Sequence, residues 1–150
     1  MYIVALNDRP ELVPVVAEWL HAEFDHARGP SLAKRVDQLR AQTPPEATFI
    51  LCDNQVPVGT ASLVVNDLPS RPELTPWLAS VLVRPEFRGR GYSARLVRHV
   101  ETAAASTAPT LWLYTWTAAP LYARLGWEFV GPERDTDRDI PVVLMKRDLR

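Results

Sequence analysis

Two apolar segments joined by a short polar turn place the strongest constraint on how this chain can fold. The segments ATFILCD (residues 47–53) and VPVGTASLVVN (residues 56–66) are rich in β-branched and apolar residues, and the turn-forming pair Asp53-Asn54 joins them. This pattern predicts an antiparallel hairpin. A hairpin in the middle of the chain favours an α/β (α+β) domain with a mixed, mostly antiparallel sheet.

Helical spacing dominates the chain before this hairpin. Residues 2–6 predict a short strand, after which Asp8 is expected to cap a first helix that carries Pro10 in its first turn. Ser31 is expected to cap a second helix that ends near Gln42, because the prolines that follow cannot continue the helical ladder.

Strands and helices alternate after the hairpin. Apolar spacing predicts helices at residues 91–104 and 119–126, and Gly126 stands where helices commonly end. The proline-rich residues 67–76 are expected to form a stiff loop. We expect one domain over residues 1–150, with further strands at 77–83, 110–116, 127–130 and 140–146.

Charge and composition argue against several classes of partner. The formal net charge is −1, so no global basic field favours nucleic acid or an anionic membrane surface. The chain has no apolar run of membrane-spanning length and no signal-peptide pattern at its start, so we expect a cytoplasmic protein. Cys52, the one cysteine, lies in an apolar run and is expected in the core. The three histidines lack metal-ligand spacing, and no metal is predicted.

The stretch RGRGYSA, from Arg88 to Ala94, carries two glycines between a strand-like and a helix-like segment. Glycine permits a tight turn and a close ligand approach, and the amides that open a helix are unpaired and lie at the positive end of its dipole. Arg88 and Arg90 add charged donors. The stretch therefore predicts a phosphate site, although two glycines alone are also typical of a plain surface turn.

A dinucleotide site is the competing interpretation of this stretch. The letters GRGYSA satisfy G-x-G-x-x-G/A, but that fingerprint needs an acidic residue about 20 positions later to hold a ribose. The segment near that distance, LWLYTWTAA (residues 111–119), contains no carboxylate. The turn also follows an antiparallel hairpin, where no first βαβ unit is expected. An NAD-linked enzyme is therefore a distant alternative.

The chain resembles the GNAT superfamily of acyl-CoA-dependent N-acetyltransferases. The family signature Arg/Gln-x-x-Gly-x-Gly/Ala is matched by residues 88–93, with Ser93 in place of the last small residue. The segment LYARLGWEFVG (residues 121–131) resembles the family's C-terminal Tyr-x-x-x-Gly-aromatic segment, and the order of elements also follows the family. The resemblance implies the GNAT fold, in which a bulged central strand splays from its neighbour between flanking helices.

The resemblance also implies acetyl-CoA as co-substrate. Its pantetheine would pair with the exposed backbone of the central strand, supplied by Leu82 and Val83, and its pyrophosphate would lie on the loop amides of Gly89 to Ala94. A backbone N–H at the bulge would stabilise the oxyanion. The implied cofactor-binding residues are Val81, Leu82, Val83, Arg88, Gly89, Arg90, Gly91, Tyr92, Ser93 and Ala94.

The implied reaction is acetyl transfer to a primary amine, on a small molecule or a protein N-terminus. Tyr122 matches the family's usual general acid, and a phenol with a pKa of about 10 is protonated at neutral pH. Packing between helix and sheet is the alternative role for Tyr122. The central strand carries Ala79 and Ser80 and no carboxylate, so the general base is open among Glu23, Asp25, His26, Asp67 and Glu73.

Two features favour a second function class. The missing strand glutamate and Ser93 are compatible with a non-catalytic acetyl-CoA-binding sensor or regulatory module, and a homodimer is compatible with either function. Residues 133–139, ERDTDRD, are expected to form a polar loop at the acceptor site, since the positions of a calcium loop are not filled. Trp116 is expected to line the acyl or acceptor pocket, and the other tryptophans to lie in the core.

Overall fold

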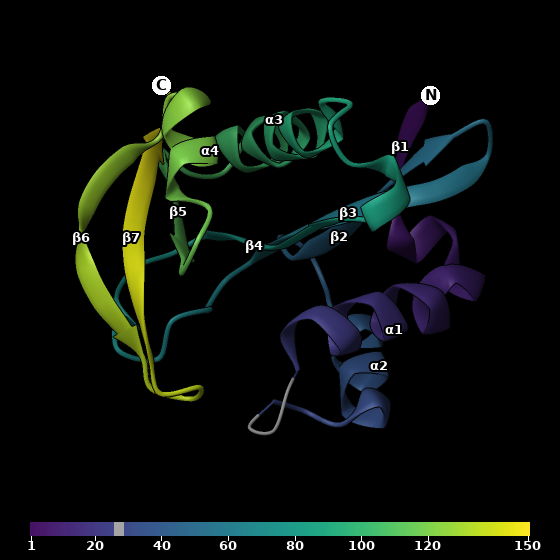
Figure 1. Cartoon of the computed structure of the whole chain (residues 1–150), viewed down its shortest axis with the longest axis horizontal. Helices are drawn as coiled ribbons and strands as arrows, with labels where there is room; N and C mark the ends of the chain where they lie inside the picture. Colours follow the sequence, from purple (N-terminus) through teal and green to yellow (C-terminus); the bar gives the residue numbers. More distant parts are fainter. Residues whose placement is uncertain (26–28) are drawn as a thin grey trace.

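A central sheet with helices on both faces organises the computed structural model, which describes residues 1–25 and 29–150 (Figure 1). The strands follow the order β1-β2-β3-β4-β5-β7-β6 in one sheet, and only the β4–β5 pair is parallel. This confirms the mixed, mostly antiparallel sheet. The strands are β1 (Tyr2–Ala5), β2 (Ala47–Asp53), β3 (Val56–Val64), β4 (Trp77–Val83), β5 (Thr110–Thr115), β6 (Glu128–Asp135) and β7 (Ile140–Asp148).

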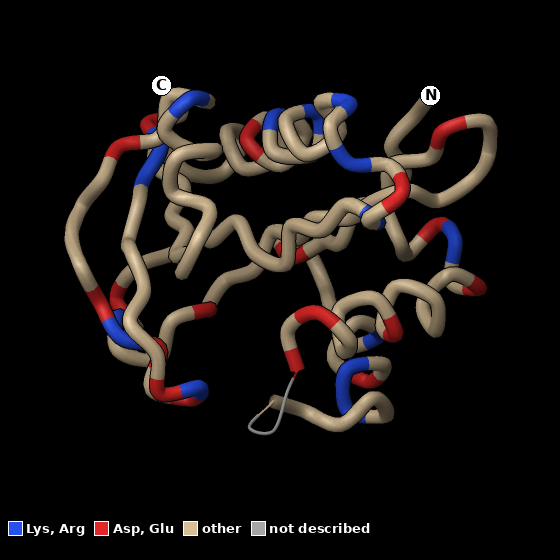
Figure 2. The backbone as a smooth tube through the Cα atoms, viewed as in Figure 1, with Lys and Arg blue, Asp and Glu red and all other residues tan. Residues whose placement is uncertain are grey.

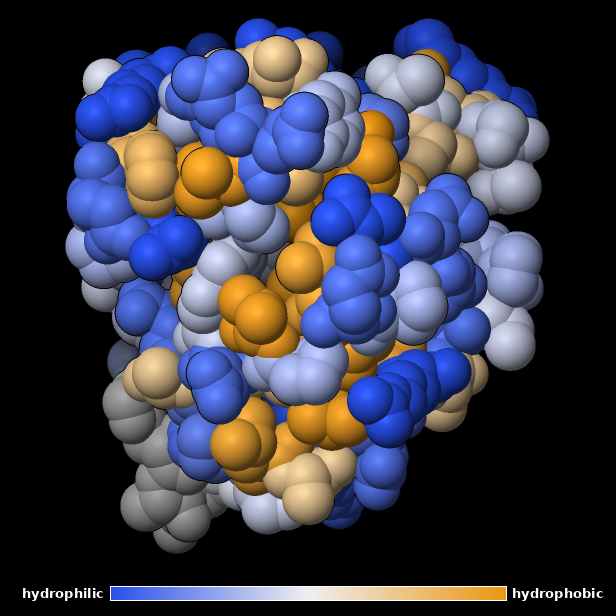
Figure 3. All heavy atoms as spheres, turned by 90° about the vertical axis from the view of Figure 1, so that its right-hand side faces the viewer, coloured by the Kyte–Doolittle hydropathy of each residue, from blue (hydrophilic) through white to orange (hydrophobic). Residues whose placement is uncertain are grey.

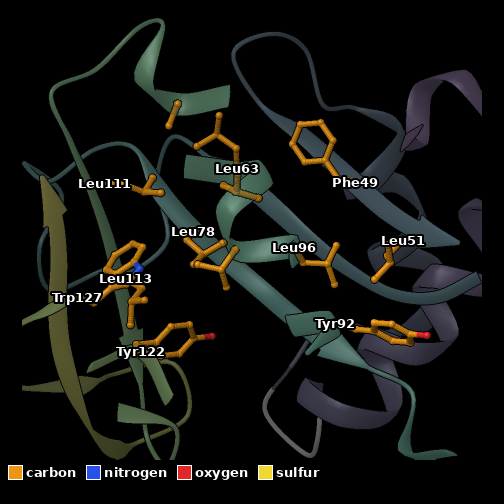
Figure 4. Packing of buried hydrophobic residues seen from close by; sticks show 14 of the residues in the cluster. Phe49, Leu51, Leu63, Leu78, Tyr92, Leu96, Leu111, Leu113, Tyr122 and Trp127 are labelled. Atoms are coloured by element: carbon orange, nitrogen blue, oxygen red, sulfur yellow. The ribbon is translucent and has the colours of Figure 1, made fainter. Parts of the chain in front are cut away.

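Two helices cover each face of the sheet (Figure 1). One face carries α1 (Val13–Phe24) and α2 (Leu32–Arg40), and the other carries α3 (Tyr92–Ala105) and α4 (Ala119–Arg124). The larger buried cluster lies under α3 and α4 (Figure 4), and its members Leu96, Val97 and Val100 are fully buried. A second cluster, which includes Cys52, packs α1 and α2 against the sheet. Short 3₁₀ turns lie at Leu6–Asp8, Pro10–Leu12 and Pro85–Phe87.

The start of α1 differs from the sequence prediction. Asp8 does not cap this helix; Pro10 opens a separate 3₁₀ turn and α1 begins at Val13. Pro14 supplies the reason, because it has no N–H to donate to a preceding turn and is tolerated in the first turn of a helix. The prediction for α2 is confirmed, since the Ser31 hydroxyl accepts a hydrogen bond from the Lys34 amide at 3.1 Å.

The β2–β3 hairpin forms as predicted, with its turn shifted by one residue. Asp53 pairs with Val56, so the turn residues are Asn54 and Gln55. Both have positive φ, 52° and 65°, which matches the twist that two-residue hairpin turns require. The hairpin is therefore a tight two-residue turn centred one position later than the sequence pattern indicates.

The central strand β4 is bulged and separates from β5. On the β3 side, Thr60 pairs with Leu82 but Ser62 pairs with Ala79, so β4 carries one extra residue, and Ser80 has a φ of 56°. On the other side, β4 pairs with β5 only where Trp77 lies opposite Trp112. Beyond that point the two strands diverge, which confirms the splayed central strand.

On the face shown in Figure 3, hydrophobic side chains form small clusters between hydrophilic ones. Within the described ranges no helix combines the length and the apolar character needed to cross a bilayer.

A buried carboxylate joins α3 to the C-terminal strands. Glu101 accepts hydrogen bonds from Arg98 Nη1 at 2.9 and 3.0 Å and from Trp127 Nε1 at 3.1 Å. Arg147 Nε lies 3.6 Å from Glu101 Oε1. Because Trp127 lies three residues after the end of α4, this carboxylate helps to fix the corner that carries Tyr122.

We expect Glu101→Ala to lower the free energy of unfolding by about 1–3 kcal/mol, because it leaves the buried Trp127 N–H without its acceptor and removes the negative charge beside Arg98 and Arg147. Urea denaturation measures the change. Glu18→Ala, at an exposed position on α1, is the matched control and should change stability by less than about 0.5 kcal/mol. Equal stability of the two variants would contradict a stabilising role for Glu101.

Candidate active site

The loop that opens α3 presents free backbone donors. Gly89 and Gly91 have φ values of 79° and 78°, and Gly91 is the N-cap of α3. A Cβ built on either glycine meets nothing within 4 Å, so the space in front of the loop is open. Within the part of the chain that the structure describes, no carbonyl or side chain accepts from the amides of residues 89–94. The loop can therefore receive an anion.

Side chains tether this loop at both ends. The Tyr92 hydroxyl donates to Asp53 Oδ2 at 2.6 Å, which ties the start of α3 to the β2–β3 turn and raises the pKa of Tyr92. Arg88 Nε donates to the Val83 carbonyl at 3.0 Å, which ties the loop to the end of β4. The Arg90 guanidinium lies 5.4 Å from the centre of the Phe87 ring. The amides are thus held in place before any ligand arrives.

A groove of about 250 Å³ extends from this loop along β4 and is lined by residues of α3 and α4, with Glu23 of α1 at its edge. Phe87, Leu121 and Tyr122 contribute to its wall. Of the ten predicted cofactor-binding residues, Arg90 and Ala94 do not line it. The other eight do: Val81, Leu82, Val83, Arg88, Gly89, Gly91, Tyr92 and Ser93.

Tyr122 is positioned by the way α4 ends. The Gly126 amide donates to the Ala123 carbonyl and the Trp127 amide to the Tyr122 carbonyl, and Gly126 has a φ of 92°. This is a Schellman motif, in which the third residue before the cap contacts the second residue after it. The Tyr122 and Trp127 rings accordingly meet edge to face, with centroids 6.1 Å apart. The spacing Tyr-x-x-x-Gly-aromatic is thus the spacing of this helix end.

The Tyr122 hydroxyl points away from Trp127, and the side chain lines the groove (Figure 4). No hydrogen bond to this hydroxyl occurs within residues 1–25 and 29–150. Burial raises the pKa of Tyr122 to about 12, so the phenol is protonated at neutral pH and has a proton to donate.

A second cavity, of about 410 Å³, lies beside the groove. Asp67, Tyr114 and Arg138 line it, together with Phe24 from α1 and Gln38 from α2. The two cavities share a boundary where β4 and β5 diverge. The residues that line both are Glu23, Val81, Ala118 and Tyr122.

The turn between β6 and β7 forms one wall of the second cavity. Asp137 and Arg138 line it, as expected for the polar segment 133–139. Asp135 is buried and accepts from the amides of residues 137 and 138, and Arg138 Nη1 lies 3.0 Å from Asp135 Oδ2. This carboxylate therefore holds the turn in shape.

Aromatic side chains form another part of the wall. Trp116 is 42% exposed and lines the second cavity, as expected, with its ring edge to face against Phe24. Arg138 stacks over Trp116 at 6.0 Å. Arg35 and Tyr114 were not predicted as site residues, because nothing in their sequence context shows that α2 and β5 meet at one cavity.

Two of the five general-base candidates are excluded by their contacts. The buried Asp25 receives a bidentate hydrogen bond from Arg35, and Arg138 lies 3.8 Å away. Glu73 is exposed, pairs with Arg71 and lines neither cavity. His26 lies outside the described residues.

Glu23 and Asp67 are the two described candidates that reach the site. Glu23 is exposed and lines both cavities, and Asp67 lines the second one. Burial raises the pKa of Asp67 from its ordinary value of 3.8 to about 7. Figure 2 shows acidic segments at the end of α1, on the β3–β4 connection and in the β6–β7 turn, on the α1 and α2 side of the sheet.

Solved structures with the same fold are acetyltransferases. An aminoglycoside 6′-N-acetyltransferase complexed with coenzyme A superposes with a TM-score of 0.79 at 17% identity, covering 100% of this chain and 98% of the other. The corresponding enzyme from Enterococcus faecium gives 0.76 at 18% identity, with 100% and 98% covered. YncA from Salmonella typhimurium, solved with its cofactor acetyl-CoA, gives 0.74 at 18% identity, with 100% and 94% covered.

Sequence comparison gives the same result at the level of the family. No curated relative matches the chain. The profile of the acetyltransferase (GNAT) family matches residues 13–127, which include the Gly-rich loop, the splayed strand and Tyr122. The chain therefore belongs to the GNAT family of acetyltransferases.

Proposed function

We propose that this protein transfers the acetyl group of acetyl-CoA to a primary amine, with direct attack of the amine on the thioester. The observation that carries the proposal is the junction of two cavities at the split between β4 and β5. One cavity begins at the free amides of residues 89–94. The other cavity is polar and opens on the opposite face of the sheet. A donor and an acceptor can thus meet there from opposite sides.

The groove on the α3 side suits coenzyme A. Six consecutive free amides at residues 89–94, at the positive end of α3, favour a diphosphate. Two of the structurally similar acetyltransferases were solved with coenzyme A or acetyl-CoA bound.

The open edge of β4 supplies partners for the pantetheine amides. The Arg84 amide donates a hydrogen bond to the Val58 carbonyl, so the main-chain groups of Arg84 face β3. Main-chain groups alternate in direction along a strand. Those of Leu82 therefore also face β3, whereas those of Val81 and Val83 face the split between β4 and β5. The Val83 carbonyl already accepts from Arg88. We therefore assign the pantetheine pairing to Val81 and the Val83 amide, and a lining role to Leu82. This revises the sequence expectation, which included the Leu82 backbone.

The chemistry requires a proton for the leaving thiolate. Tyr122 lines both cavities and is protonated at neutral pH, so it serves as the general acid. The Val81 amide, next to the bulge at Ser80, faces the split and can donate to the oxyanion that develops on the thioester carbonyl.

A panel of amines tests the proposed function directly. Purified protein is mixed with acetyl-CoA and with aminoglycosides, polyamines, simple alkylamines and peptides with free N-termini, and thiol release is followed. We expect acceptor-dependent release of coenzyme A. Tight acetyl-CoA binding with no release for any acceptor would favour the non-catalytic sensor.

Tyr122→Phe should lower kcat by about 100-fold or more, the usual contribution of a positioned general acid, and leave the affinity for acetyl-CoA unchanged. Steady-state kinetics and calorimetric titration with acetyl-CoA measure the two effects. Tyr2→Phe, at an exposed tyrosine outside both cavities, is the control. An unchanged kcat for Tyr122→Phe would leave this residue only its packing role.

Gly91→Ala should weaken acetyl-CoA binding by about tenfold, since a left-handed conformation costs a residue with a Cβ about 1–2 kcal/mol and the loop relieves it by moving its amides. Gly131→Ala is the matched control, because Gly131 has no positive φ and an added Cβ meets nothing within 4 Å. Equal affinities for the two variants would show that the loop amides do not hold the cofactor.

A further inference from the structure

Asp67 is the carboxylate in the wall of the acceptor cavity that is not fully exposed, since the other two in its lining, Glu23 and Asp137, are exposed. Asp67 follows β3, and the next residue, Leu68, is buried in a cluster with Trp77 and Leu144. This anchor holds Asp67 in the wall of the cavity. In the described ranges, no hydrogen bond or ion pair reaches the Asp67 carboxylate.

The neighbouring buried carboxylates are all neutralised. Arg35 pairs with Asp25, and Arg138 pairs with Asp135, whose oxygens also accept two amide hydrogen bonds. These two are structural, since each holds a turn or a helix end. Asp67 is half-buried and, unlike these two carboxylates, is left free to accept a proton from a ligand.

Asp67 and Tyr122 stand on opposite faces of the sheet. Asp67 lies with Tyr114 and Arg138 on the side of α1 and α2, whereas Tyr122 belongs to the buried cluster under α3. The split between β4 and β5 joins the two sides. On the basis of the proposed function, we propose that Asp67 is the general base that deprotonates the acceptor ammonium.

The surroundings of Asp67 suit a base that works near neutral pH. Burial raises the pKa of Asp67 to about 7; Asp135 adds to the rise, while Arg138 and Arg35 oppose it. Tyr114, which faces it from β5, has its own pKa raised by burial and by this carboxylate. A base with a pKa close to the working pH combines a sufficient ionised fraction with a strong pull on the proton.

The proton transfers balance across the two faces. Asp67 takes one proton from the acceptor ammonium and later releases it to solvent. The neutral amine attacks the carbonyl carbon, the C–S bond breaks, and Tyr122 gives its proton to the thiolate. The second nitrogen proton is lost as the amide forms, and it restores the phenol. The sum is one amide, one free thiol and one proton.

Asp67→Asn tests the assignment with a matched pair of acceptors. Ethylamine is almost wholly charged at neutral pH, whereas trifluoroethylamine, of nearly the same shape, is mostly neutral and needs no base. We expect the variant to lower kcat/KM for ethylamine by about 100-fold and for trifluoroethylamine by less than about threefold. The rising limb of the wild-type ethylamine profile near pH 7 should disappear in the variant.

Two further variants complete the experiment. Asp8→Asn, an exposed carboxylate outside both cavities, should behave as wild type. Glu23→Gln tests the rival: loss of the pH 7 limb in Glu23→Gln and not in Asp67→Asn would overturn the proposal. Equal losses with both amines in Asp67→Asn would also overturn it, since they would indicate a structural role. If wild type releases no coenzyme A with any amine, the proposed function fails and this assignment fails with it.

Stability against pH gives a readout that does not depend on turnover. Between about pH 4 and 7 the folded state holds a proton on Asp67 that the unfolded chain has lost, so the free energy of unfolding falls as pH rises. Asp67→Asn should therefore gain stability relative to wild type across that window. A constant difference between the two proteins would show that the Asp67 carboxyl titrates normally and would contradict its role as a base at neutral pH.

Discussion

The separation of β4 from β5 creates both the cofactor groove and its junction with the acceptor cavity. Parallel pairing ends at Trp77 and Trp112, and the extra residue at Ser80 turns the following part of β4 away. The bulge leaves main-chain groups of β4 unpaired on one edge and opens a passage through the sheet. Without it, β4 and β5 would pair along their length, and the two cavities would be separated by a continuous sheet.

The two faces of this passage differ in their chemistry. On the α3 side, glycines and helix geometry leave amides free, and one buried phenol keeps its proton. On the α1 side, arginines neutralise the buried Asp25 and Asp135 beside a polar cavity, whereas the half-buried Asp67 has no hydrogen bond or ion pair among the described residues. The site proposed for the diphosphate and the carboxylate proposed to take the acceptor's proton thus lie on opposite sides of the split between β4 and β5.

Sequence patterns predicted correctly those helix ends that depend only on neighbouring residues. Ser31 caps α2, Gly91 opens α3 with a positive φ, and Gly126 ends α4. The start of α1 was predicted wrongly from Asp8 and Pro10, because Pro14 moves the first helical turn to Val13. The strand Trp77–Val83 was predicted with its bounds, but its bulge was known only through the family resemblance.

The chain by itself determined the order of its elements, the Gly-rich loop and the helix end that holds Tyr122, because turns, caps and apolar periods act over a few neighbouring residues. Only the tertiary structure decided which carboxylates are free, because Arg35 and Arg138 reach Asp25 and Asp135 from other elements of the fold. Burial, which sets the pKa of Asp67, likewise depends on segments distant in sequence that pack around it.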